Sequence, residues 1–188
     1  ELFESFLKQL PHDTQQAAAL ARQHDSHLHG PASMKAYKKK PLRHAVEIRN
    51  ESFIDPAFVR LLKRYNVALV IADTAGKWPY REDVTSDFVY LRLHGAEELY
   101  ASGYTPEALE RWGERIDAWN HGQQPADPQL IAPGQKPKAR RSREVFCYFD
   151  NDIKVRAPFD ARRLLEHFHL DKDLATRPGE PVAEGVLS

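Results

Sequence analysis

Residues 67–72 have the sequence VALVIA, an almost unbroken apolar run that ends at Asp73. Runs of this kind are typical of parallel strands that are covered on both faces. Segments 88–93 (FVYLRL) and 144–149 (EVFCYF) are similar, and 44–49 (HAVEIR) has the pattern of another short strand. The sequence therefore predicts four strands.

Helical patterns separate and surround these strands. Asp55-Pro56 and Thr105-Pro106 are helix starts, because proline is favoured at the first helical position. Residues 158–169 are expected to form the last helix, and residues 2–10 and 14–22 show helical spacing at the other end of the chain. Strands alternating with helices predict an α/β fold with a parallel sheet, although the pattern fits an open sheet or half of a barrel equally well.

Composition limits the classes of function. Lys and Arg number 27, as do Asp and Glu, so the formal net charge is zero, whereas a dedicated nucleic-acid binder usually carries a basic excess. The single cysteine, Cys147, rules out an intrachain disulfide and favours a reducing, cytoplasmic location. No segment approaches the roughly 18 apolar residues of a membrane helix, so no membrane partner is expected.

Polar residues collect where each predicted strand ends, and the carboxyl ends of parallel strands form the usual ligand site of α/β folds. Because side chains alternate along a strand, one face should carry Glu47 with Arg49, another Arg92 with His94, and a third Tyr148 with Asp150. We expect Arg92 to pair with Glu47 or Asp150, because an unpaired arginine in a partly enclosed site is costly. The candidate site residues at strand ends are Glu47, Arg49, Asp73, Arg92, His94, Tyr148, Asp150 and Asn151.

Four strings, HAVEIRNESF, FVYLRLHG, ELYASGYTPEALERW and VFCYFDND, resemble in order and spacing the signatures of the YecE-like family, the domain of unknown function 72. The resemblance covers residues 1 to about 170. It implies a TIM-type barrel, of which this chain would be the C-terminal half with strands five to eight. The family commonly has two Asn after its final Tyr-Phe, where this chain has Asp150-Asn151. The family's chemistry is not established, so the resemblance implies a fold and not a reaction.

The expected organisation is one half-barrel domain over residues 1–170. Segment 121–143, rich in Gly, Gln, Pro and basic residues, is interpreted as a flexible basic linker within it, and 171–188 as a loose tail. The chain begins at Glu1 within a helical pattern and lacks the family's N-terminal half. Since four parallel strands cannot close a barrel, we expect the isolated chain to need the missing half or to self-associate.

The leading functional hypothesis is an enzyme acting on a small anionic or phosphorylated substrate. Arg49 and Arg92 would hold the anion, because guanidinium groups match phosphate and carboxylate in two-point contacts. A proton would be moved by Glu47, Asp73 or His94. The ligand would be oriented by Tyr148, Asp150 and Asn151, and by Tyr100 and Tyr104 from the loop after the third strand.

Two alternatives remain open. Glu47, Asp73, His94 and Asp150 are suitable ligands for a metal-assisted phosphodiester hydrolase, but no close-spaced His/carboxylate motif supports a metal, so no metal site is predicted and the cofactor stays unknown. The other alternative is a non-enzymatic nucleic-acid binding module, in which phosphates would contact a basic stretch: Lys136, Lys138, Arg140, Arg141 and Arg143. No aromatic residue lies within this stretch to stack on bases, which counts against this alternative. A further cluster, His24, His27 and His29, is interpreted as a surface group.

Overall fold

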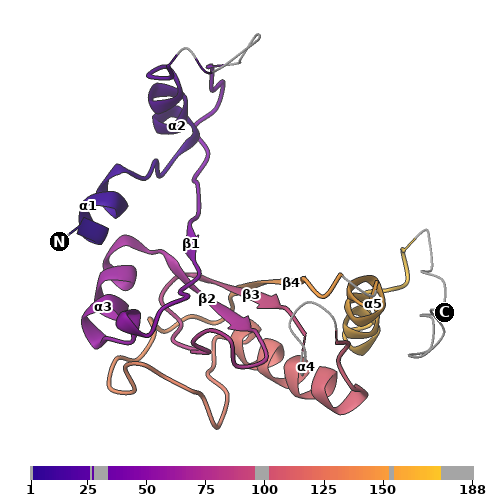
Figure 1. The fold of residues 1–188 in the computed structure, drawn as a ribbon. Coiled ribbons are helices and arrows are strands. Elements are labelled where there is room, and N and C mark those ends of the chain that lie inside the picture. The colour runs from indigo at the N-terminus through magenta and orange to yellow at the C-terminus, as the bar shows by residue number, and fades with distance from the viewer. Residues whose placement is uncertain (1, 26, 28–33, 96–101, 153–154, 175–188) are drawn as a thin grey trace. The chain divides into compact units, whose positions relative to one another are not determined.

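The computed structural model describes residues 2–25, 27, 34–95, 102–152 and 155–174 (Figure 1). The chain divides into two compact units, Glu1–His44 and Ala45–Ser188, whereas one domain was expected over residues 1–170.

The first unit contains α1 (Leu2–Gln9) and α2 (Thr14–Ala21). Asp13 caps α2, because its carboxylate accepts hydrogen bonds from the amides of Gln15 and Gln16, both at 2.9 Å. The helical spacing of this segment was predicted from the sequence.

The second unit is built on β1 (Ala45–Val46), β2 (Ala68–Asp73), β3 (Phe88–Leu93) and β4 (Glu144–Phe149). In the described residues these form one parallel sheet in chain order, β1-β2-β3-β4, which confirms the α/β class. The predicted strand at 44–49 is too long, since only two residues pair. Asn50 caps a 3₁₀ turn, η1 (Glu51–Phe53), through the amide of Ser52 at 2.9 Å, and the extended segment ends before it.

Three helices follow strands of this sheet: α3 (Pro56–Tyr65), α4 (Pro106–Asn120) and α5 (Ala157–His167). Asp55 and Thr105 cap the first two helices at the predicted starts. α3 packs against β2, while α4 and α5 pack against β4 and against each other (Figure 1). None of the helices in the described residues is both long and apolar enough to cross a membrane.

The two faces of the sheet carry different side chains, because successive residues of a strand point to opposite faces. The helix side holds Leu91 and Leu93, both 0% exposed, which pack with residues of α4 and α5 such as Trp119 and Leu164. Cys147 packs there as a small apolar group, and burial raises the pKa of its thiol to about 12.

The opposite face, here called the aromatic side, is defined by Phe88, Tyr90, Phe146 and Tyr148. Tyr90 stacks on Tyr148 with ring centroids 5.1 Å apart, and Phe88 meets Phe146 edge-on at 5.9 Å. Tyr148 is nevertheless 50% exposed. This face is thus less covered than the helix side.

Segment 121–143 contains no helix or strand, but it is anchored and is not a free linker. Asp83, buried beside it, accepts hydrogen bonds from the amides of Ile131 (2.6 Å) and Ala132 (3.0 Å). Gly122 has φ +75°, and a Cβ there would clash with the carbonyl of Arg140. The physical reason for the anchoring is that buried carboxylates need donors, which this segment's backbone supplies. Of the predicted loose tail, 175–188 lies outside the described residues.

Candidate functional site

Five polar side chains from the carboxyl ends of β1, β3 and β4 meet on the aromatic side of the sheet. This group, here called the charged cluster, consists of Glu47, Arg49, Arg92, His94 and Asp150. Arg92 lies at its centre: one terminal nitrogen is 2.8 Å from Glu47 Oε2, and the other contacts Asp150 Oδ2. The predicted pairing of Arg92 with Glu47 or Asp150 is confirmed, and it involves both acids.

His94 lies behind Arg92 and touches the same two oxygens. Its Nδ1 is 3.1 Å from Asp150 Oδ2 and its Nε2 is 3.7 Å from Glu47 Oε2. The ring is 0% exposed and meets Trp78 edge-on at 5.9 Å. Burial and the nearby positive charge of Arg92 lower the pKa of His94 below its ordinary 6.5, so the ring is neutral at pH 7. A ligand outside the protein therefore meets Asp150 or Arg92 before it meets His94.

Glu47 is held as a carboxylate by two arginines. Burial opposes its ionisation, but the hydrogen bond from Arg49 Nε at 2.7 Å and the contact with Arg92 outweigh burial and lower its pKa below 4.5. A carboxylate stabilised in this way is a weak base. Glu47 is thus better suited to positioning the arginines than to the proton transfer for which it was a candidate.

Arg49 makes a second contact that sequence reasoning missed. Its guanidinium carbon lies 4.1 Å from the centroid of the Trp78 ring, and Lys77 Nζ lies 5.3 Å from the same ring. Trp78 and Lys77 belong to the loop after β2, which has no recognisable motif. The one sequence feature that could have indicated this contact is a tryptophan in a loop that follows a strand end, since such loops often carry ligand contacts in α/β folds.

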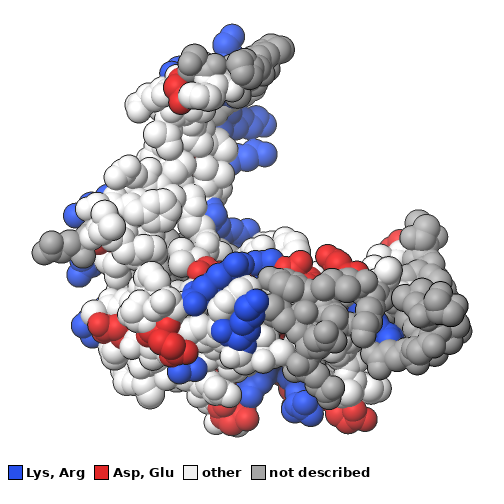
Figure 2. Space-filling view, in the orientation of Figure 1, with Lys and Arg blue, Asp and Glu red and all other residues white. Residues whose placement is uncertain are grey.

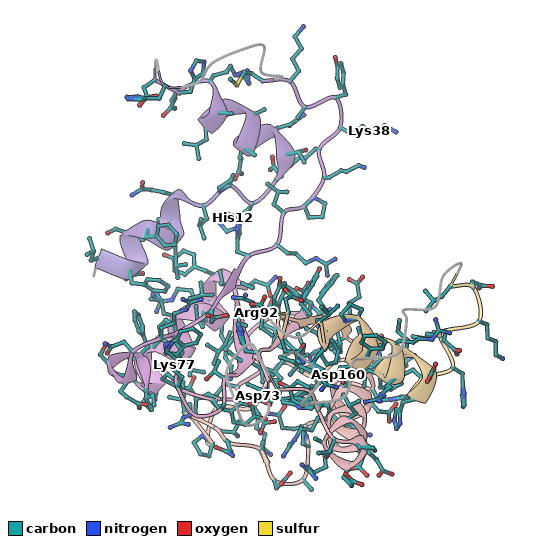
Figure 3. All side chains as sticks on the ribbon, turned by 45° about the vertical axis from the view of Figure 1, so that its right-hand side comes forward. His12, Lys38, Asp73, Lys77, Arg92 and Asp160 are labelled. Carbon is teal, nitrogen blue, oxygen red and sulfur yellow. The ribbon has the colours of Figure 1, made fainter. Side chains whose placement is uncertain are left out.

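Asp73 does not join the charged cluster, although it ends the strand next to Arg92; Figure 3 labels the two side chains at separate positions. Asp73 pairs in register with Leu93, so its side chain lies on the helix side. There the hydroxyl of Tyr104 donates to Asp73 Oδ2 at 3.1 Å and accepts from the Gly95 amide at 3.1 Å. Burial raises the pKa of Asp73 above 3.8, against the opposing effect of the Tyr104 hydrogen bond.

A cavity of about 280 Å³ opens beside Asp73 on the helix side. This helix-side pocket is lined by one acid, one small residue, three aromatic residues and two arginines: Asp73, Ala108, Tyr80, Tyr104, Trp112, Arg111 and Arg115. Of the predicted site residues, Asp73 and Tyr104 therefore belong to a second location.

Three other predicted ligand residues have different settings. Tyr148 is exposed and stacked on Tyr90, below the charged cluster on the same face. Asn151 is completely buried, and its side-chain amide donates to Ser102 O (3.0 Å) and Asp160 Oδ2 (2.9 Å). It therefore links the loop between β3 and α4 to α5. Tyr100 lies outside the described residues.

The arrangement gives little support to the metal alternative. Within the described ranges, no three His, Cys, Asp or Glu side chains are grouped so that they could hold a metal ion. Asp73 is on the opposite face from Glu47 and Asp150, and Arg92 lies between those two acids, where its positive charge opposes a cation.

The basic stretch of segment 121–143 is not one uniform surface. Arg143 is buried, with its guanidinium donating to Lys138 O at 2.6 Å, and Arg140 lies 3.6 Å from Asp87. On the visible face of the second unit, basic and acidic side chains are interspersed (Figure 2). In the first unit, His27 pairs with Asp25 at 3.1 Å, and His29 lies outside the described residues.

The fold and the polar carboxyl edge define the class: an α/β protein with a parallel sheet and charged strand ends. Residues 1–184 match the family described as "Protein of unknown function DUF72", and the chain belongs to that family, which is also called YecE-like. The resemblance seen in the sequence is thus confirmed.

Two solved structures show a similar fold. A DUF72 family protein from Thermotoga maritima MSB8 is 23% identical with a TM-score of 0.53, and the alignment covers 69% of this chain and 47% of that one. A DUF72 family protein from Enterococcus faecalis V583 is 19% identical with a TM-score of 0.53, covering 74% and 52%. This chain therefore spans about half the length of these relatives. None of the curated proteins matches it.

Proposed function

We propose that the carboxyl edge of this sheet binds a small anionic or phosphorylated ligand through Arg49 and Lys77. The observation that carries the proposal is the pair of cations beside Trp78, at 4.1 and 5.3 Å from its ring. Arg49 is 52% exposed and uses Nε on Glu47, so its terminal nitrogens remain available to an anion. Lys77 is exposed and forms no ion pair with any described residue.

Arg92, the other expected anion ligand, has a different part in this proposal. Both of its terminal nitrogens already contact carboxylates, so an anion would have to displace Glu47 or Asp150. Arg92 then keeps the two acids in place and limits their repulsion of the ligand. The anion is held by Arg49 and Lys77 at the edge of the cluster.

In the enzymatic form of the proposal, Asp150 exchanges the proton with the substrate. Asp150 is partly exposed, and His94 Nδ1 behind it is 3.1 Å from the same carboxylate oxygen. A neutral buried imidazole next to a carboxylate accepts a proton through that carboxylate without touching the substrate. Glu47 and Asp73, the other proton-transfer candidates, are respectively held ionised by arginines and placed on the opposite face.

The binding proposal is tested with inorganic phosphate and isothermal titration calorimetry at low salt. Replacing Arg49 by Gln should weaken binding by about tenfold to a hundredfold, because a charge-assisted hydrogen bond contributes about 1.5–3 kcal/mol. Lys77→Gln should weaken it less. Arg60, exposed on α3 and outside the cluster, supplies the matched control R60Q. Equal affinities for R49Q and R60Q would refute the proposal.

We also propose that the sheet is half of a closed (β/α) barrel whose interior the aromatic side faces. Support comes from the parallel chain-order topology and from the likeness to relatives of about twice the length. The ring contacts between β3 and β4 are diagonal: Tyr90 is in register with Phe146, but its ring stacks on Tyr148, two residues further along β4. Diagonal neighbours of this kind suit strands tilted to a barrel axis.

The barrel proposal predicts that the isolated chain self-associates through the aromatic side. Multi-angle light scattering should find species larger than a monomer, and Tyr148→Lys should reduce them, because a charge opposes burial of this face. A monodisperse monomer of the unaltered chain with a sharp thermal transition would show that the sheet needs no further strands.

A further inference from the structure

The helix-side pocket has a composition that the charged cluster does not share. Three aromatic side chains, Tyr80, Tyr104 and Trp112, line a cavity of about 280 Å³ together with the carboxyl group of Asp73. Tyr80 and Trp112 meet edge-on with centroids 6.1 Å apart. Aromatic rings around a single acid form the type of cage that holds alkylammonium groups, because the ring faces and the carboxylate both attract a cation.

The acid in this cage receives hydrogen bonds from uncharged donors and forms no ion pair with any described residue. Asp73 Oδ2 accepts the Tyr104 hydroxyl, while burial raises the pKa of the carboxyl group. Donors on the Ala75 backbone and the Trp112 side chain also favour the carboxylate. A cation placed next to Asp73 favours its ionised form and so gains from the same low-dielectric surroundings that penalise the lone carboxylate. The cage therefore attracts a positive group more strongly than a neutral one.

The two arginines of the pocket differ in their partners. Arg115 is matched by two acids, with one terminal nitrogen 3.1 Å from Glu82 and the other 2.9 Å from Asp127. Arg111 is exposed and forms no ion pair within 4 Å with any residue in the described part of the chain, although its charge adds to the backbone hydrogen bond that chiefly lowers the pKa of Glu107 on the same helix. One available positive charge thus lies on the wall of a cavity that also holds an acid.

We propose that the helix-side pocket binds a small zwitterion, whose alkylammonium group enters the aromatic cage beside Asp73 and whose anionic group meets Arg111. Opposite charges on one short molecule match the two unlike charges of one cavity. The pocket is separate from the charged cluster, because Asp73 and Leu93 lie on the helix side whereas Ala72 and Arg92 lie on the other. The inference does not depend on the anion site at Arg49 and Lys77.

The probes are glycine betaine, choline and acetate, which carry both charges, the cation alone and the anion alone. Isothermal titration calorimetry should find betaine bound more tightly than choline, and acetate bound weakest at this pocket. R111Q should weaken betaine binding about threefold to tenfold and leave choline unchanged, since an exposed charged contact contributes about 1 kcal/mol. R60Q is the matched control, because Arg60 is exposed on α3 and does not line the pocket.

Asp73→Asn tests the cage itself and should weaken both betaine and choline more than tenfold, because it removes the charge that faces the cation. The amide keeps an oxygen that accepts the Tyr104 hydroxyl, and circular dichroism melting checks that the variant is folded. The proposal is overturned if betaine does not bind, if acetate binds as tightly as betaine, or if a folded D73N binds choline as well as the unaltered protein does.

Discussion

On the helix side of the sheet, Leu91 and Leu93 are completely buried beneath α4 and α5, whereas on the aromatic side Tyr148 leaves half of its surface to solvent. The two faces come from the same strands and alternate residue by residue. The helix side is apolar because helices of the same unit cover it. The aromatic side carries large rings and, at its carboxyl end, charges. The difference means that helices of the unit cover one face, while the other face is left partly open to solvent at Tyr148.

Ion pairs on the two sides differ in the same way. Glu82 is 0% exposed and is surrounded by donors: the Tyr80 hydroxyl at 2.7 Å, the Gln129 amide at 2.7 Å and Arg115 at 3.1 Å. Glu47 and Arg92 are also paired; the Glu47 side chain is 11% exposed, and the Arg92 side chain keeps 30% of its surface exposed. A buried pair costs more to break than a partly solvated one, because the remaining charge has no water.

The largest expected difference between the two faces is the loss in free energy of unfolding when one side chain at the centre of each face is truncated. Leu91→Ala is expected to lower the free energy of unfolding by about 2–5 kcal/mol, because it leaves a cavity in a covered core. Tyr148→Ala should cost less than about 1 kcal/mol, since half of the ring is already in water. Urea unfolding followed by circular dichroism measures both. Similar losses for the two variants would contradict the distinction between the faces.

Removal of one acid from each side should give a smaller contrast. Glu82→Ala is expected to cost about 3 kcal/mol, because it strips Arg115 and the Gln129 amide of a buried partner. Glu47→Ala should cost about 1 kcal/mol, since Arg49 and Arg92 can turn to solvent or to Asp150. Thermal melting compares the pair, with Glu82→Gln as the conservative control. A larger loss at Glu47 would mean that the charged cluster, and not the Glu82 network, is the main polar support.

The smallest expected effect is a pH dependence that comes from His94. Its pKa in the folded protein is lowered below 6.5, so the unfolded chain binds more protons than the folded one as pH falls below that value. The contribution of the neutral His94 ring to the free energy of unfolding is therefore fully present above pH 6.5, and it is lost as pH falls through the folded-state pKa. Asp73 and Asp160, whose pKa values are raised by burial, act in the opposite direction at lower pH.

The measurement is urea unfolding of the unaltered chain and of His94→Asn between pH 7.5 and about 5.5, a window that lies above the ordinary carboxyl pKa values. The variant should lose part of the decrease in stability that the unaltered chain shows on acidification. A pH profile unchanged by H94N would show that His94 titrates alike in both states.

Much of the fold was predictable because its signals are local. The bounds of β3 and β4 follow from short apolar runs, and the starts of α3 and α4 from Asp55-Pro56 and Thr105-Pro106. The shared face of Arg92 and His94 follows from their spacing of two residues, and so does their contact with the same acids.

What only the tertiary structure decided depends on register and on distant partners. Asp73 was expected at the same end of the strands as Arg92, and it lies there, but it is Ala72 that pairs with Arg92, and one residue of difference moves a side chain to the opposite face. The anchoring of segment 121–143 on Glu82 and Asp83, like the position of Trp78 against Arg49, joins residues far apart in the chain. The sequence by itself determined the α/β class and the polar character of the strand ends, since these depend on neighbours along the chain. The division of those polar residues into a charged cluster and a helix-side pocket depends on which strand positions lie side by side, and no local pattern specifies this.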